Sequence, residues 1–279
     1  MVATILHGRA LAETLRERLT EEAARYAHVY GRRATLALVS AGHDPTAALY
    51  AGQVARSCQR IGLDCQMRSF DDDVAEAALR ETVARLGERD DIQGVVVLLP
   101  LPPHIRQRVV TEALAPEKDI DGLGPRNAGR LLHGLASYVP STADAARELL
   151  RDAGIALKGK TAVVVGRSNV GGKPAALLFL RARATVTICH SRTPDLAALT
   201  RRADVLFAST GRPGSITADM VKPGAVVLDA GMNAVAGRVV GDVDFEGVAE
   251  VAEAITPVPG GLGPLTNLVL IRHALLGPS

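Results

Sequence analysis

The sequence of 279 residues contains no tryptophan, and its aromatic residues together make up only 3%. Proteins that bind single-stranded nucleic acids stack the bases on aromatic side chains, so this composition speaks against that function. The formal net charge is +2, which gives no reason to expect a general binder of nucleic acid or of membrane surfaces. An anionic ligand would therefore have to be held by local groups.

Cysteine and long hydrophobic runs are also scarce. The three cysteines, Cys58, Cys65 and Cys189, are odd in number and lack C-x-x-C spacing, which favours thiols in a reducing compartment over a disulfide framework. No apolar run is long enough to cross a bilayer, and Met1–Ala12 lacks the apolar core of a signal peptide. No cluster of His, Cys and acidic residues has metal-ligand spacing. We therefore expect a cytoplasmic protein with neither a membrane segment nor a metal.

Helical and strand patterns alternate in the first part of the chain. Runs of strand length occur at Thr35–Ser40, Asp64–Phe70 and Gly94–Leu99. Helical patterns cover Leu11–Ala27, Thr46–Ile61, Val74–Gly87 and Arg106–Leu114. This order favours a mostly parallel sheet with helices on both faces. Residues 122–140 then look irregular.

A second alternating series follows the helix expected at Thr142–Ala153. Its expected strands are Thr161–Val165, Thr185–His190, Val205–Ser209 and Val226–Asp229, followed by a hairpin arm at Ala234–Asp244 and a helix at Leu265–Leu276. The sequence thus predicts two α/β domains. The first spans residues 1–140 and is completed by a C-terminal helix, 263–279. The second, 141–262, is a Rossmann-type domain, and the cleft between the two is the expected ligand site.

A glycine-rich turn follows the apolar strand Thr161–Val165. The turn, Gly166–Pro174, leads directly into the helical segment Ala175–Leu180. This is the context of a phosphate loop, because glycine lets the backbone approach a pyrophosphate and the helix N-terminus offers free N–H groups. The spacing departs from G-x-G-x-x-G, so the turn alone is a weak signal. The residues that we expect to contact a dinucleotide here are Gly166, Arg167, Ser168 and Gly172.

The end of the next strand indicates which dinucleotide binds. An NAD enzyme usually places an acidic residue there to bind the ribose diol. Here the strand is followed by His190-Ser191-Arg192-Thr193, which contains no acid. Ser191 and Arg192, helped by Arg167 from the first loop, suit the 2′-phosphate of NADP, because arginine pairs with phosphate through two hydrogen bonds.

Several further motifs lie in the order and at the spacing of one known family. They are Pro100-Leu101-Pro102 (L-P-L-P in the family), Lys118-Asp119-Ile120-Asp121-Gly122 (K-D-V-D-G), Leu228-Asp229-Ala230-Gly231-Met232-Asn233 (D-V-G-I-N) and Thr256–Thr266 (T-P-V-P-G-G-V-G-P-M-T). With the glycine-rich turn and the segment after it, the chain resembles the methylenetetrahydrofolate dehydrogenase/cyclohydrolase family over essentially its full length.

The resemblance implies two activities at one site. One is hydride transfer from 5,10-methylenetetrahydrofolate to NADP, and the other is hydrolysis of the resulting methenyl cation to 10-formyltetrahydrofolate. It also implies a homodimer, for which Ala234–Asp244 is the candidate contact. The expected cofactor contacts beyond the two loops above are Thr210, Gly211 and Met232.

The resemblance also implies the substrate contacts. Asp121 is the carboxylate that hydrogen-bonds the pterin, and Tyr50 is an aromatic wall beside the reacting carbon, so these two are the expected catalytic residues. Pro259, Gly260 and Gly261 would line the folate side of the cleft. A phenol ring packs well on a planar substrate, and a carboxylate accepts hydrogen bonds from an amino-pterin.

The sequence departs from the family at three positions of this site. The family carries a lysine four residues after the tyrosine, on the same helix face, and that position is Val54 here. The glutamine that steadies the lysine is replaced by Leu98, and the family's serine in P-A-S is Ala47. Val54 and Leu98 are still expected to line the substrate site. Valine has no proton to move, and leucine leaves no buried amide without a partner.

These departures predict a dehydrogenase whose cyclohydrolase activity is weak or absent, because hydride transfer depends on positioning rather than on the lysine. Two alternatives stay open. In the first, the protein is an ordinary bifunctional enzyme in which another residue, such as Gln53, replaces the lysine. In the second, it binds folate or dinucleotide without turnover, or acts on another imine-like substrate.

Overall fold

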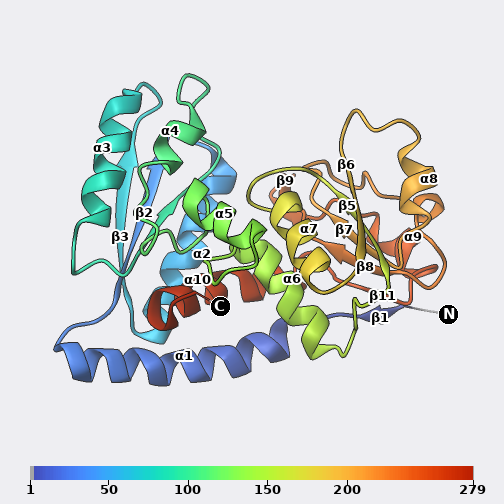
Figure 1. The fold of residues 1–279 in the computed structure, drawn as a ribbon, viewed down its shortest axis with the longest axis horizontal. Coiled ribbons are helices and arrows are strands. Elements are labelled where there is room, and N and C mark those ends of the chain that lie inside the picture. Colours follow the sequence, from blue (N-terminus) through green and yellow to red (C-terminus); the bar gives the residue numbers. More distant parts are fainter. Residues whose placement is uncertain (1–2, 279) are drawn as a thin grey trace. The chain divides into compact units, whose positions relative to one another are not determined.

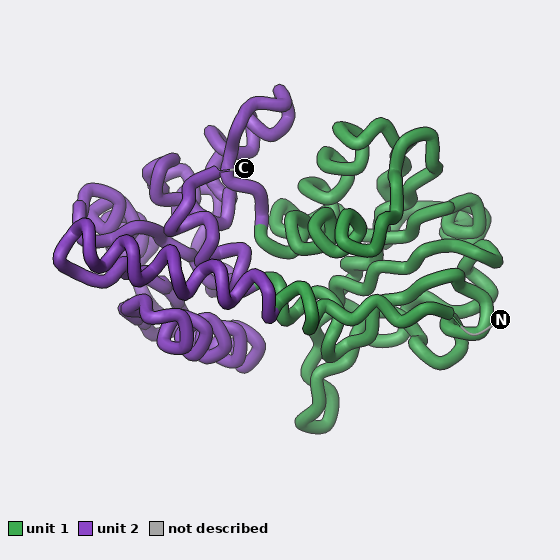
Figure 2. Tube along the Cα trace, turned by 90° about the horizontal axis from the view of Figure 1, so that it is seen from below, with its two compact units in different colours: residues 1–12, 141–266 green, residues 13–140, 267–279 purple. Residues whose placement is uncertain are grey.

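The computed structural model describes residues 3–278 (Figure 1) and divides into two compact units (Figure 2). One, here called the three-stranded unit, comprises residues 13–140 and 267–279. The other, the six-stranded unit, comprises residues 1–12 and 141–266.

The three-stranded unit contains a parallel sheet in the order β3-β2-β4. The strands are β2 (Thr35–Ala41), β3 (Asp64–Phe70) and β4 (Gly94–Val97). Its helices are α1 (Arg9–Tyr30), α2 (Pro45–Ile61), α3 (Glu76–Gly87), α4 (Gln107–Thr111), α5 (Pro125–Leu132) and α10 (Gly263–Leu276), of which α1 and α10 begin in the other unit. The central strand β2 is buried along nearly its whole length, as an apolar strand between two parallel neighbours should be.

Helix α2 has clear start and stop signals in the sequence. Asp44 caps its N-terminus by accepting a hydrogen bond from the backbone N–H of Ala47 at 2.8 Å, and Pro45 occupies the first turn. Gly62 ends the helix in the left-handed conformation, with φ of 96°. The buried face consists of Ala47, Ala51, Val54, Cys58 and Ile61. This register decides which α2 side chains reach the candidate site.

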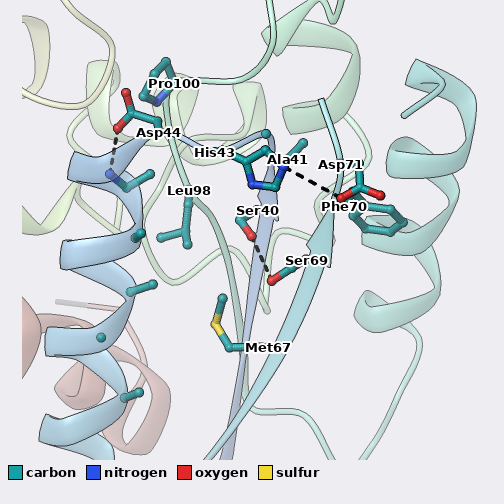
Figure 3. Close-up of a pocket in the computed structure, with 16 residues that line it drawn as sticks. Ser40, Ala41, His43, Asp44, Met67, Ser69, Phe70, Asp71, Leu98 and Pro100 are labelled. Atoms are coloured by element: carbon teal, nitrogen blue, oxygen red, sulfur yellow. Dashed lines mark hydrogen bonds and ion pairs between the residues drawn. The ribbon is translucent and has the colours of Figure 1, made fainter. Parts of the chain in front are cut away.

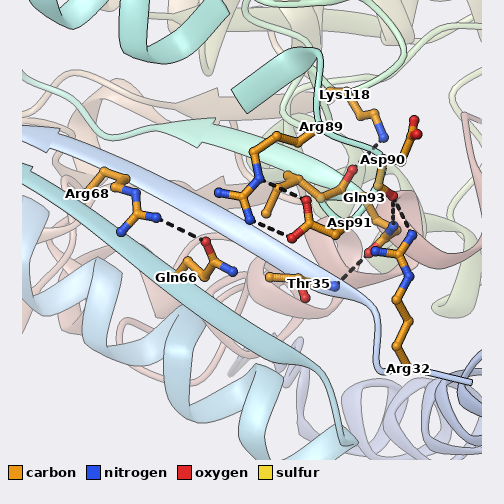
Figure 4. Close-up of polar contacts among 10 residues, drawn as sticks. Arg32, Thr35, Gln66, Arg68, Arg89, Asp90, Asp91, Gln93 and Lys118 are labelled. Carbon is orange, nitrogen blue, oxygen red and sulfur yellow. Dashed lines mark hydrogen bonds and ion pairs between the residues drawn. The ribbon is translucent and has the colours of Figure 1, made fainter. Parts of the chain in front are cut away.

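A polar network ties the amino ends of β2 and β4 together (Figure 4). The Gln93 side chain accepts from the backbone N–H of Thr35 at 2.7 Å and donates to the Asp90 carbonyl at 3.2 Å. Arg32 donates to the same carbonyl at 2.6 Å, and the Lys118 ammonium donates to the carbonyl of Ile92. These contacts fix one end of the sheet, so the loops at the carboxyl ends of the strands are the ones available to bind a ligand.

The six-stranded unit has a parallel sheet in the order β1-β11-β8-β7-β5-β6. Its strands are β1 (Thr4–Ile5), β5 (Thr161–Val165), β6 (Thr185–Cys189), β7 (Val205–Ala208), β8 (Val226–Asp229) and β11 (Ala254–Ile255). Its helices are α6 (Ser141–Asp152), α7 (Gly172–Arg181), α8 (Leu196–Thr200), the short η1 (Ala218–Met220) and α9 (Phe245–Ala249). The strand order reverses at β5, between β6 and β7, which is where such sheets bind ligands.

The expected hairpin is present as β9 (Asn233–Val235) and β10 (Arg238–Val240), a separate antiparallel pair. The predicted first domain began at residue 1, and the structure corrects that boundary. Residues Thr4 and Ile5 form a strand that pairs with Ala254 and Ile255 of β11, so the first twelve residues belong to the six-stranded unit. A strand of two residues is too short to leave a periodic pattern.

Two other segments differ from expectation. The stretch expected to be irregular contains helix α5, whose first residue is Pro125 and which buries only Asn127 and Leu131. The boundary predicted at residue 262 falls at 266, inside α10. Within the residues that the structure describes, no helix is both long and apolar enough to span a membrane.

Candidate active site

The glycine-rich turn connects β5 to α7 in a tightly packed loop. The N–H of Gly166 donates to the Cys189 carbonyl at 2.9 Å, and the N–H of Gly171 donates to the Ser168 hydroxyl at 3.1 Å. A Cβ on Gly166, whose φ is 129°, would lie 2.1 Å from the Ser209 carbonyl oxygen, and one on Gly172 would lie 2.0 Å from that of Gly166. Both positions therefore require glycine. The close backbone at the start of α7 fits the approach of a pyrophosphate.

The segment after β6 forms a turn stabilised by its own polar groups. The N–H of His190 donates to the Thr193 hydroxyl at 2.9 Å, and the N–H of Arg192 donates to the His190 ring nitrogen at 3.1 Å. The side chains of Ser191 and Arg192 are exposed, and so is that of Arg167 in the preceding loop. These side chains are accessible from solvent, and their binding to a phosphate on the adenosine ribose stays a prediction.

The remaining predicted cofactor residues follow β7 and β8. The backbone N–H groups of Thr210 and Gly211 donate to the Asp242 carboxylate, and Met232 is 36% exposed. Asp242 and Asp229, to which the sequence assigned no role, are 0% and 3% exposed. Burial raises the pKa of Asp229, three backbone hydrogen bonds lower it, and the charge of the neighbouring Asp242 raises it, so that the pKa is about 6.

The departures from the family motif lie in the three-stranded unit. Val54 on α2 is 0% exposed and Leu98, just after β4, is 2% exposed. Tyr50, one helical turn before Val54, is half-buried. Ala47, Ala51 and Leu98 line part of a pocket of about 470 Å³ between α2 and the ends of β2 and β3 (Figure 3). The wall formed by these three side chains is apolar.

The turn that carries Asp121 is fixed from inside by its neighbour Asp119. The buried Asp119 carboxylate accepts from the N–H groups of Leu123 and Gly124 and from the Asn127 amide, each at 2.9 Å. Burial nevertheless raises the pKa of Asp119 to about 7. Asp121 itself is half-buried at the same turn. Of the two acids in the motif, Asp119 stabilises the turn, and the substrate-binding role of Asp121 stays a prediction.

The predicted substrate residues Pro259, Gly260 and Gly261 lie in the six-stranded unit, directly before α10. The N–H of Gly261 donates to the Pro257 carbonyl at 2.8 Å, and the carbonyl of Gly260 accepts from the N–H of Gly8 at 3.0 Å. Gly260 has φ of 117°, a conformation that suits glycine. Within residues 3–278, no group of three or more His, Cys, Asp or Glu side chains is arranged to hold a metal.

The parallel six-stranded sheet, its strand-order reversal and the glycine loop before α7 define a dinucleotide-binding α/β protein. Two family models match the chain. Residues 6–121 match the tetrahydrofolate dehydrogenase/cyclohydrolase catalytic domain, and residues 140–277 match the NAD(P)-binding domain of the same family. The chain belongs to the tetrahydrofolate dehydrogenase/cyclohydrolase family and contains its NAD(P)-binding domain. The family and the fold class predicted from the sequence are thereby confirmed.

Alignments with related proteins extend over nearly the whole chain. The bifunctional protein FolD of Chloroflexus aurantiacus is 50% identical over 276 residues, which is 99% of this chain and 97% of the relative. A crystal structure of the bifunctional FolD enzyme from Campylobacter jejuni has a TM-score of 0.93 at 36% identity, covering 99% and 98%. The FolD of Trypanosoma brucei, solved with NADP and an inhibitor, has a TM-score of 0.93 at 37% identity, covering 99% and 97%. The roles of individual residues stay predictions.

Proposed function

We propose that the protein oxidises 5,10-methylenetetrahydrofolate to 5,10-methenyltetrahydrofolate with NADP as the hydride acceptor, and hydrolyses the product weakly or not at all. The observation that carries this proposal is the burial of Val54 and Leu98, which are at most 2% exposed, at the positions where the family motif has lysine and glutamine. Neither side chain can activate or orient a water molecule. Ala47, which lines the same pocket as Leu98, also lacks the hydroxyl of the family's serine.

The residues needed for hydride transfer are all retained. Asp121 accepts hydrogen bonds from the pterin, and Tyr50 packs beside the reacting carbon. The loop Gly166–Gly172 holds the pyrophosphate, and NADP supplies the nicotinamide ring that accepts the hydride. Pro259, Gly260 and Gly261 line the folate side. Correct positioning of the two reactants supplies much of the rate in such a step, and no group on the protein has to take the hydride.

The first test measures both reactions on the purified protein. With 5,10-methylenetetrahydrofolate and NADP, absorbance of NADPH should rise with saturable kinetics. With 5,10-methenyltetrahydrofolate alone, its disappearance should match the spontaneous rate, while the Campylobacter jejuni enzyme serves as the positive control. Robust, saturable hydrolysis would show an ordinary bifunctional enzyme, with Gln53 as the residue to examine next. Absence of NADPH formation would indicate binding without turnover or a different substrate.

The cofactor preference rests on Arg192 and Arg167. Replacing Arg192 by alanine should raise the KM for NADP by about 10-fold or more, because a charged hydrogen-bond pair with the 2′-phosphate is lost. The KM for NAD and for the folate should not change. The matched control is Arg181→Ala, which removes the same charge from the far end of α7, about 15 Å along the helix. Equal KM values for NADP in Arg192→Ala and the unchanged protein would refute the assignment.

We also propose a homodimer in which the β9–β10 hairpin contacts the partner. A two-stranded hairpin is marginally stable by itself, and Val235 on this one is 44% exposed. Burial of such a surface in a second copy would stabilise it. A monomer in sedimentation equilibrium at micromolar concentration would contradict this proposal.

A further inference from the structure

The buried carboxylate of Asp242 connects two segments beyond the carboxyl ends of β7 and β8 in the six-stranded sheet. One oxygen, Oδ2, accepts from the N–H groups of Thr210 at 2.5 Å and Gly211 at 3.1 Å, just after β7. The other oxygen, Oδ1, accepts from the Asn233 amide at 2.8 Å, at the start of the hairpin. With an exposed fraction of 0%, Asp242 is inaccessible to a ligand and acts on its neighbours only.

Asp229 holds Asp242 in place. Its carboxylate accepts from the N–H groups of Gly231 at 2.8 Å, Asp242 at 3.0 Å and Val243 at 3.0 Å. The two carboxylates thereby fix the chain leaving β8 and the chain returning from the hairpin. The packing around them leaves no spare room. A Cβ on Gly231 would lie 2.5 Å from the Asp242 carboxyl carbon, and one on Gly241 would lie 1.8 Å from Asp229 Oδ2.

The loop that Asp242 holds also touches the glycine-rich turn. The carbonyl oxygen of Ser209, the residue before Thr210, lies where a Cβ of Gly166 would be. The Ser209 hydroxyl is similarly close to Gly171, at 2.6 Å from an added Cβ. The N–H of Ser209 donates to Val165, the last residue of β5, at 2.8 Å. A shift of Thr210 and Gly211 would therefore displace the turn that receives the pyrophosphate.

We propose that Asp242 is a positioning residue for dinucleotide binding: its carboxylate holds the Thr210–Gly211 backbone against the phosphate loop and ties that backbone to the hairpin through Asn233. This inference rests on the proposed binding of NADP at Gly166–Gly172. It assigns to Asp242 no contact with the dinucleotide. The Asp242 carboxylate accepts hydrogen bonds from the N–H groups of Thr210 and Gly211 and thereby holds the adjoining loop in the geometry that the ligand needs.

The test uses Asp242→Ala in the full-length protein and measures the Kd for NADP+ by isothermal titration calorimetry, without turnover. We expect the Kd to rise about 30-fold, because two backbone donors and one amide lose a charged acceptor. In kinetics, the KM for NADP should rise while the KM for the folate stays within about two-fold. The Kd of Asp242→Asn for NADP+ should lie between those of the unchanged protein and Asp242→Ala, since hydrogen bonds of a neutral acceptor are roughly half as strong as those of a carboxylate.

The matched control is Asp119→Ala. Asp119 is equally buried and accepts from two backbone N–H groups and one asparagine amide, the same donor set as Asp242, but it belongs to the three-stranded unit. Asp119→Ala should lower the melting temperature about as much as Asp242→Ala does and leave the Kd for NADP+ unchanged. A general loss of stability would affect both variants alike, so only a positioning role separates them.

The outcomes distinguish this inference from the proposed function. If the unchanged protein fails to bind NADP+, the proposed cofactor is wrong. If it binds and Asp242→Ala binds equally well, the positioning role is wrong. Should Asp242→Ala not fold, Asp242→Asn decides, and a Kd equal to that of the unchanged protein overturns the proposal.

Discussion

The double variant Val54→Lys/Leu98→Gln is expected to hydrolyse 5,10-methenyltetrahydrofolate about 10²-fold faster than the unchanged protein, since a positioned general base contributes on that order. The lysine restores a group that can orient and deprotonate water. The glutamine gives the lysine a hydrogen-bond partner at a place where Val54 and Leu98 are now buried. The measurement is the loss of methenyl absorbance at saturating enzyme, corrected for the spontaneous rate.

The two substitutions should work only together. Lysine alone at a position with 0% exposure is desolvated, which lowers its pKa and destabilises the charged form. Glutamine alone at position 98 leaves a buried amide without a partner, at a cost of about 1–3 kcal/mol. Each single variant should therefore lose stability and gain little hydrolysis. A positive coupling between the two in a double-mutant cycle is the expected signature.

The dehydrogenase reaction provides the internal control for this experiment. If the double variant forms NADPH at a rate close to that of the unchanged protein, its substrate site is intact. A folded, dehydrogenating double variant that still fails to hydrolyse the methenyl compound would contradict the explanation. The loss of activity would then have to be traced to residues other than Val54 and Leu98, with Ala47 as the next to restore to serine.

Most strands of the two parallel sheets could be predicted from the sequence because they are bounded by turn residues and most of them are apolar. The expected Asp64–Phe70, Thr161–Val165 and Val226–Asp229 agree with the structure to the residue. The strands β1 and β11 have two residues each and exist only because they pair with each other and, for β11, with β8. Such strands are products of tertiary contact, so no local pattern marks them.

Within the candidate site, the sequence could indicate only the glycines and the exposed polar residues. The glycine-rich turn and the arginine after β6 have a recognisable chemistry in the sequence itself. Asp229 and Asp242 could not be recognised as positioning groups, because an acidic residue is almost always exposed and nothing local shows its burial. The one available signal is that Gly231 and Gly241 flank them, since a carboxylate packed against the main chain needs glycine there.

The phosphate loop supplies the second large effect. Replacing Gly172 by alanine should raise the Kd for NADP+ by about 100-fold or more, because overpacking a tight site costs roughly 1–3 kcal/mol and the loop must also move away from the ligand. The added Cβ would lie 2.0 Å from the Gly166 carbonyl oxygen and 2.5 Å from its carbon. Both are backbone atoms, so no side chain can rotate to make room.

Gly129→Ala is the control for this substitution. Gly129 lies within α5, and a Cβ there meets nothing within 4 Å. Alanine should leave NADP+ affinity unchanged and hold or raise the melting temperature, since it favours a helix by about 1 kcal/mol over glycine. Calorimetry well below the melting temperature of Gly172→Ala separates lost affinity from lost stability. If folded Gly172→Ala kept the affinity of the unchanged protein, the pyrophosphate would have to bind away from the start of α7. Gly166 and Gly172 would then be required only for the packing of the loop.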